Sequence, residues 1–202
     1  MTRPQSVIFD LGKVLVDFDY SIAGRRIAAR GAISARQVQQ FIDHSPLLSR
    51  FETGQINREQ FFCEVRAATG FEGTIDEFSE FFADIFTPIG EMVALQDELR
   101  ERRVPTYIFS NTNELAVAHI RRNFPFFSRF DGYILSYEHG AMKPDSRLYT
   151  VVEAKTGRRG DELFYTDDRP ENIETAVSLG WQVVLHENPQ RTRLALQSAL
   201  LV

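Results

Sequence analysis

Five short, almost entirely apolar segments constrain the fold of this 202-residue chain more than any other feature. Each is bounded by Gly, Asp, Asn or Pro, and several are nearly continuous runs of Val, Ile, Leu, Phe and Tyr. This pattern is typical of parallel strands that are covered on both faces. The segments are Ser6 to Asp10, Pro105 to Ser110, Gly132 to Leu135, Leu163 to Thr166 and Trp181 to His186. The sequence therefore predicts a five-stranded parallel sheet.

Helical segments separate the later strands. They span Asn113 to Asn123, Asp145 to Thr156 and Pro170 to Leu179, and Gly157 and Gly180 end the last two. Strands that alternate with helices in this way predict an α/β fold with a doubly wound, Rossmann-like sheet.

The interval between the first and second strands is different, because residues 18–103 contain no convincing strand but several helix starts. These starts are Ser34, the pair Asn57 and Gln60, and the pair Thr74 and Glu77. The aromatic-rich stretches FFCEV and FSEFFADIF are expected to form the core of this helical insert, with Cys63 packed among them. The predicted domains are an α/β core of residues 1–17 and 91–202 and a helical cap of residues 18–90.

Composition excludes several classes of protein. A net charge of −5 argues against binding to a nucleic-acid backbone, and no apolar stretch is long enough to span a membrane. One cysteine excludes an internal disulfide and fits a reducing compartment, and the N-terminal segment lacks the apolar run of a secretory signal. We expect a cytoplasmic monomer or homodimer that binds neither nucleic acid nor membrane.

Polar residues of a consistent kind follow the predicted strands. Asp10 ends the first strand, Ser110 and Asn111 end the second, and the acidic pair Asp167 and Asp168 ends the fourth. The loop after the third strand supplies one further group, the ammonium of Lys143. If the first, second and fourth strands are neighbours, these groups surround one point at the carboxyl end of the sheet, where ligands bind in open α/β folds.

Such a cluster suits chemistry on a phosphate group. Adjacent carboxylates repel one another unless a hard cation such as Mg²⁺ lies between them. A lysine and a hydroxyl beside the metal would hold phosphoryl oxygens, and Asp10 could attack phosphorus to form an acyl phosphate that water later hydrolyses. Taken one at a time, these residues are more often turn or helix-capping groups, and it is their shared position at strand ends and their order that indicate a catalytic site.

Four segments resemble, in order, the motifs of the haloacid dehalogenase-like hydrolases. They are FDLGKVL, FSNTN, KPDSRLY and YTDDRPENI. The chain is most similar to the subgroup with a helical cap, which includes α-glucose-1-phosphate phosphatases and the phosphatase domain of soluble epoxide hydrolases. The resemblance covers essentially the whole chain. It implies a phosphoric monoester hydrolase that acts on a small phosphorylated metabolite, such as a sugar 1-phosphate, through an aspartyl-phosphate intermediate.

The resemblance also implies roles for individual residues. Asp10 would be the nucleophile and a metal ligand, and Ser110 and Lys143 would orient the phosphoryl oxygens. Asn111 would contact the substrate or the main chain.

The resemblance assigns Mg²⁺ to the acidic end of the site. Asp168 would ligate the metal directly. Asp167 would either support the direct ligands from behind or act as an alternate ligand, and Asn172 would hold the acidic loop in place. Gly12 would contribute a metal ligand through its main-chain carbonyl.

Gly12 also departs from the family pattern, because phosphatases of this kind usually carry an aspartate there. That aspartate protonates the leaving oxygen and later activates water, and such help is worth about 10²–10⁴-fold in rate. Its absence matters least for a weakly basic leaving group, which favours a sugar 1-phosphate. The side chains that could replace it are Asp17, Asp19, His44, Glu52 and His139, and the sequence does not choose among them.

Two other functions stay open at this stage. A haloacid dehalogenase uses an aspartate nucleophile on the same fold without a metal, but the paired acids Asp167 and Asp168 would repel its carboxylate substrate. A catalytically impaired protein that only binds a phosphorylated ligand is suggested by Gly12 alone. The intact set of Asp10, Lys143 and the acidic pair favours catalysis.

Overall fold

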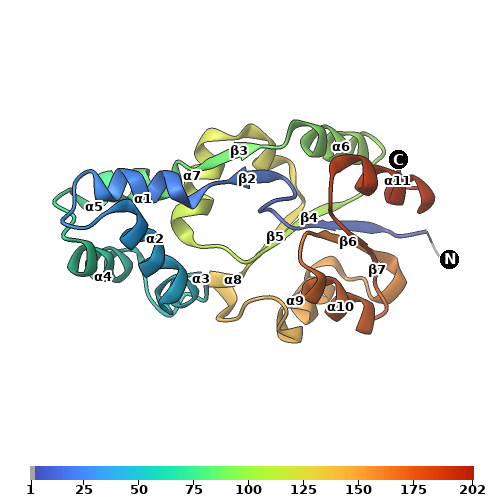
Figure 1. Cartoon of the computed structure of the whole chain (residues 1–202). Coiled ribbons are helices and arrows are strands. Elements are labelled where there is room, and N and C mark those ends of the chain that lie inside the picture. The colour runs from blue at the N-terminus through green and yellow to red at the C-terminus, as the bar shows by residue number, and fades with distance from the viewer. Residues whose placement is uncertain (1–2) are drawn as a thin grey trace.

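The computed structural model describes residues 3–202, apart from the side chains of Asp43 and His44. It contains a five-stranded, fully parallel sheet with the strand order β5-β4-β1-β6-β7 (Figure 1). The strands are β1 (Ser6–Phe9), β4 (Thr106–Ser110), β5 (Gly132–Leu135), β6 (Leu163–Asp167) and β7 (Gln182–Leu185). The predicted α/β fold is confirmed, and each predicted strand lies within one residue of its observed bounds.

The central position of β1 decides where the polar groups meet. It pairs with β4 on one side and β6 on the other, so that Phe9 lies opposite Ile108 and Thr166. The main-chain N–H of Asp10 donates to the carbonyl of Thr166 at 2.9 Å, which extends the pairing one residue beyond the strand. The carboxyl ends of β1, β4 and β6 are therefore held side by side.

Alternate residues of β1 belong to different apolar clusters, which shows that both faces of the sheet are covered. Val7 and Phe9 pack with Met92 and Leu196, whereas Ile8 packs with Leu148 and other residues of the opposite cluster. The helices of the core are α6 (Gly90–Glu101), α7 (Glu114–Asn123), α8 (Ser136–His139), α9 (Ser146–Thr156), α10 (Pro170–Ser178) and α11 (Pro189–Ser198). Two short 3₁₀ helices, Pro125–Arg129 and Gly160–Glu162, complete it. Neither α8 nor α11 was predicted from the sequence.

The inserted segment consists of five helices that lie together at the end of the molecule away from both termini (Figure 1). They are α1 (Tyr20–Ala28), α2 (Ala35–His44), α3 (Leu47–Glu52), α4 (Arg58–Thr69) and α5 (Ile75–Ala83). The expected capping boxes at Asn57 and Thr74 are present, and Ser34 forms a third with Gln37. Phenylalanines from both aromatic-rich stretches form the centre of a separate apolar cluster, as predicted.

Two predictions about this segment were wrong. A short antiparallel ribbon joins it to the core, formed by β2 (Val16–Phe18) and β3 (Phe86–Pro88), although no strand was expected between residues 18 and 103. Three-residue strands are too short to produce a sequence periodicity, and these two pair across the whole insert. Cys63 is exposed and not packed in the cap, because the buried face of α4 is formed by Phe61, Val65 and their neighbours.

Within residues 3–202, the structure contains no helix that is both long enough and apolar enough to cross a membrane.

Candidate active site

The candidate active site is a pocket of about 190 Å³ between the carboxyl end of the sheet and the inserted helical segment. The ends of β1, β4 and β6 supply its floor, so residues far apart in the sequence come together. Of the expected site residues, those in its lining are Asp10, Gly12, Ser110, Asn111, Lys143 and Asp168. Asp167 is completely buried and does not line the pocket.

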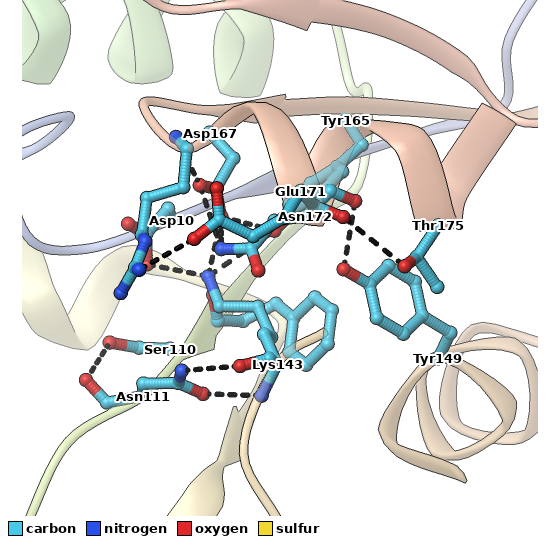
Figure 2. A network of polar contacts seen from close by, with 12 residues as sticks. Asp10, Ser110, Asn111, Lys143, Tyr149, Tyr165, Asp167, Glu171, Asn172 and Thr175 are labelled. Atoms are coloured by element: carbon cyan, nitrogen blue, oxygen red, sulfur yellow. Dashed lines mark hydrogen bonds and ion pairs between the residues drawn. The ribbon is translucent and has the colours of Figure 1, made fainter. Parts of the chain in front are cut away.

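Lys143 is almost completely buried, and its ammonium group joins the strand ends (Figure 2). Its Nζ donates to Asp10 Oδ1 at 2.8 Å, to Asp167 Oδ2 at 2.6 Å and to the carbonyl of Phe109 at 2.8 Å. Burial disfavours the ammonium ion, but the charges of Asp10 and Asp167 outweigh that cost and raise the pKa of Lys143. A positive charge is therefore fixed beside the Asp10 carboxylate.

The position of Lys143 is set by Asn111, which immediately follows β4. The side-chain amide of Asn111 donates to the carbonyl of Lys143 at 3.0 Å and accepts from its main-chain N–H at 2.7 Å (Figure 2). Asn111 thus fixes the loop main chain as well as lining the pocket. The neighbouring Ser110 is buried, and its hydroxyl has only a 3.3 Å contact with the carbonyl of Asn111, so it can turn toward a ligand.

Asp167 uses its carboxylate entirely within the protein. It accepts hydrogen bonds from Lys143, from the hydroxyl of Tyr165, from Asn172 Nδ2 at 2.9 and 3.0 Å, and from the main-chain N–H of Arg169 at 2.8 Å (Figure 2). Burial alone would raise the pKa of Asp167, but the charge and hydrogen bonds of Lys143 and the Tyr165 hydrogen bond lower it. Asp167 is therefore an ionised group that positions Lys143.

Asp168 differs from its neighbour because it lines the pocket. Within the described residues, no side chain donates a hydrogen bond to its carboxylate. Burial and the nearby charge of Asp167 raise its pKa, which is the expected behaviour of an acid that lacks a cation partner.

The acidic groups form a cluster that fits a hard divalent cation. One carboxylate oxygen from each of Asp10, Asp167 and Asp168 lies within 4.8 Å of the other two. Burial, together with the charge of Asp167, raises the pKa of Asp10 to about 7, against the lowering effect of Lys143. A cation would favour the ionised form of these groups, and a set of oxygen donors without His or Cys suits Mg²⁺.

Gly12 lines the same pocket, but the space beside its Cα is occupied. A Cβ atom at Gly12 would lie 2.9 Å from Cε1 of Phe18. The Phe18 ring is itself packed edge-on against Tyr20 and Phe86, with centroid distances of 5.5 and 6.0 Å. An acidic side chain at position 12 would therefore require the Phe18 ring to move.

The structure separates the candidates for the missing acid. Asp17 is exposed and pairs with Lys13, and Asp19 caps α1 by accepting from the N–H of Ser21. Neither lines the pocket, nor does the exposed His139. The side chain of His44 lies outside the described part of the chain. Glu52, the last residue of α3, does line the pocket.

Tyr165 and Asn113 are among the polar residues of the site that were not predicted. The hydroxyl of Tyr165 contacts both Asp167 and Lys143 Nζ, the latter at 3.2 Å. Its position two residues before Asp167 was a usable signal, since such residues share one face of a strand. Asn113 was expected only as a helix start. It also lines the pocket, and its buried Nδ2 has no partner within the described residues.

A family comparison agrees with this geometry. The model of a hydrolase family, the haloacid dehalogenase-like hydrolases, matches residues 4–180. The chain therefore belongs to the haloacid dehalogenase-like hydrolases, as the four sequence motifs implied.

Individual relatives include phosphatases. The chain is 25% identical over 188 residues to a sesquiterpene phosphatase of Aspergillus oryzae, covering 92% of this chain and 90% of the relative. It is 22% identical to a D-ribitol-5-phosphate phosphatase of Bacteroides thetaiotaomicron, covering 91% and 92%. A haloacid dehalogenase family enzyme from Bacteroides thetaiotaomicron, solved with magnesium and inorganic phosphate, has a TM-score of 0.77 at 21% identity, covering 90% and 93%.

Proposed function

We propose that this protein is a Mg²⁺-dependent phosphatase that hydrolyses a small phosphorylated metabolite through an aspartyl-phosphate intermediate on Asp10. The observation that carries the proposal is the contact of the buried Lys143 with Asp10, beside three clustered carboxylates at the floor of one pocket. A site of this charge pattern binds a phosphoryl group and a divalent cation together. The two phosphatase relatives support the same reaction class.

Each residue has a defined task in this mechanism. Asp10 Oδ1 is bound to Lys143, while Oδ2 accepts no hydrogen bond from the described residues and is the oxygen that attacks phosphorus. Lys143 and the Ser110 hydroxyl hold phosphoryl oxygens, and Asn111 keeps Lys143 in place.

The metal site is assigned to the acidic end of the pocket. The proposed ligands are Asp10, Asp168 and the carbonyl of Gly12. Asp167 is an alternate ligand, because its carboxylate is already hydrogen-bonded to Lys143, Tyr165 and Asn172. A bound Mg²⁺ would neutralise the charge of the phosphoryl oxygens.

The cap is proposed to close the pocket over the substrate. The apolar cluster of the insert is separate from the two clusters of the sheet, which supports a cap of residues 18–90 on a core of residues 1–17 and 91–202. Phe18, Tyr20 and Phe86, at and beside the connecting ribbon, form one wall of the pocket.

The substrate class is a sugar or polyol phosphate, with sugar 1-phosphates as the first candidates. The pocket of about 190 Å³ limits the substrate to a small molecule. The Nδ2 group of Asn113, which has no partner within the described residues, and the guanidinium of Arg169 lie in its lining and provide partners for hydroxyl groups.

A metal-independent dehalogenase is disfavoured by the same geometry. Its carboxylate substrate would lie against the carboxylates of Asp10 and Asp168, which both line the pocket. These like charges would repel the substrate unless a cation lay between them, and a metal-independent dehalogenase has no such cation.

The proposal is tested by phosphate release from a panel of sugar 1-phosphates, hexose 6-phosphates, polyol phosphates and p-nitrophenyl phosphate. Turnover is expected with Mg²⁺, loss with a chelator and recovery when Mg²⁺ is restored. The Asp10→Asn variant should fold normally and lose activity by on the order of 10⁴-fold or more. Chelator-resistant turnover, halide release from a 2-haloacid, or near wild-type activity of Asp10→Asn would contradict the proposal.

A further inference from the structure

Glu52 reaches the pocket because its main chain is docked on the core. The hydroxyl of Ser136, in core helix α8, donates to the carbonyl of Glu52 at 2.6 Å. Two residues later, Gly54 adopts φ = +67°, and a Cβ atom there would lie 2.2 Å from the carbonyl oxygen of Tyr137. Only glycine permits so close an approach. The end of α3 is thus fixed against the core next to the active site.

The side chain of Glu52 has no partner of its own. Within the described residues, its carboxyl group makes no hydrogen bond and no ion pair, although it lines the pocket together with Asp10 and Gly12. Burial raises its pKa to about 7, and the charge of Arg169 opposes this only in part. The titratable and charged groups that share the pocket with it are Tyr20, Lys13, Asp10, Lys143, Asp168 and Arg169.

The other carboxyl groups of the pocket already have a role in the proposed mechanism. Asp10 is bound to Lys143, and Asp168 belongs to the acidic cluster. The space that an acid at position 12 would occupy is filled by the Phe18 ring. Glu52 is therefore the one carboxyl group in the described lining that faces the substrate space without another assignment.

We propose that Glu52 is the catalytic acid and base of this enzyme and replaces the aspartate missing at position 12. The inference rests on the proposed phosphatase function. As Asp10 attacks phosphorus, the bond to the leaving oxygen breaks, and that oxygen takes the proton of the Glu52 carboxylic acid. The Glu52 carboxylate then removes a proton from water, whose oxygen attacks phosphorus. The bond to Asp10 breaks, phosphate leaves, and both side chains return to their starting states.

This role makes a preference for anomeric phosphates unnecessary. With a proton donor present, an ordinary alkyl phosphate and an aryl phosphate should differ only modestly in kcat/KM. Without it, the rate should fall steeply as the leaving oxygen becomes more basic. The leaving-group dependence therefore distinguishes a proton donor from a residue that only binds substrate hydroxyls.

The test measures kcat/KM for p-nitrophenyl phosphate and for a series of alkyl phosphates, in wild type, Glu52→Gln, Glu52→Asp and the control Glu59→Gln. Glu59 is an exposed glutamate in the first turn of α4, in the same cap. Thermal unfolding of each variant checks its fold.

Glu52→Gln should lose about 10²-fold in kcat/KM for alkyl phosphates and less than about threefold for p-nitrophenyl phosphate, because the aryl leaving group needs no proton. In wild type, turnover of alkyl phosphates should fall as the pH rises through the pKa of Glu52, about 7. This fall should be absent in Glu52→Gln. Glu52→Asp should show the same pattern at smaller size, and Glu59→Gln should match wild type. An equal loss for both substrate classes, or no loss, would overturn the inference. Absence of any wild-type turnover would instead contradict the proposed phosphatase function.

Discussion

The floor of the pocket and its cap-side wall use their polar groups in opposite ways. On the floor, Lys143 and Asp167 are joined to one another and to their neighbours by a closed set of short hydrogen bonds. On the wall, Glu52 is half-buried and has no hydrogen-bond or ion-pair partner within the described residues, and the other groups are mostly aromatic rings. The comparison indicates that the floor is preorganised to hold charge, whereas the wall keeps one titratable group free for the substrate.

The largest effect is expected when the hydrogen-bond network of Lys143 on the floor is removed. Lys143→Met leaves Asp10 and Asp167 without their cation and should destabilise the protein by about 3–5 kcal/mol. Phosphatase activity should fall by on the order of 10³-fold, because the residue that holds the phosphoryl group is lost. Denaturant unfolding and phosphate release measure the two effects. A variant with wild-type stability would show that the network contributes little.

The two adjacent aspartates of the floor should respond differently to substitution. Asp168→Asn should raise the Mg²⁺ concentration needed for half-maximal activity by about 10–100-fold with little change in stability. Asp167→Asn should mainly lower kcat and stability, since Asp167 accepts from Lys143, Asn172 and Tyr165. Mg²⁺ titrations of both variants, with unfolding curves, make the comparison. If both variants raised the Mg²⁺ concentration for half-maximal activity equally, Asp167 would be a direct metal ligand like Asp168.

Substitution of Glu52 should raise the stability of the protein at high pH, whereas substitution of Lys143 or Asp167 should lower it. Its pKa is raised from the ordinary value of 4.5 to about 7 in the folded protein. The folded state therefore binds the proton more tightly than the unfolded state. Protonated Glu52 therefore contributes its full share to the free energy of unfolding below pH 4.5, and this contribution is lost as the pH rises through 7.

Glu52→Gln should thus be more stable than wild type at pH 8, by on the order of 1–2 kcal/mol, and equal to it near pH 4. Chemical denaturation at the two pH values measures this, with Glu59→Gln as the control. A Glu52→Gln variant that is less stable at pH 8 would mean that the carboxylate has a stabilising partner.

The sequence predicted the floor far better than the wall. Asp10, Ser110 and Asp168 each follow a buried strand, and parallel strands bring their ends together whatever lies between them. Lys143 was placed at the site by its position in the loop after the third predicted strand and by its motif, but its contacts with Asp10 and Asp167 depend on the loop held by Asn111.

The wall depends on how the cap docks, which local patterns do not encode. Glu52 was one of five equal candidates until the contacts of Ser136 with Glu52 and of Gly54 with Tyr137 placed it at the pocket. The ribbon that carries Phe18 was missed because its strands are three residues long and pair across the insert.

The most direct test of the account is to trap the covalent intermediate. Glu52→Gln is mixed with p-nitrophenyl phosphate and Mg²⁺, quenched rapidly in acid and digested, and the peptides are weighed by mass spectrometry. We expect one phosphoryl group on Asp10, in larger amount than in wild type, because the first step needs no acid with this aryl leaving group and the second step lacks its base. The variant Asp10→Asn should carry none. Phosphate release without any phosphoryl-enzyme in either protein, or a phosphoryl group on another residue, would contradict it.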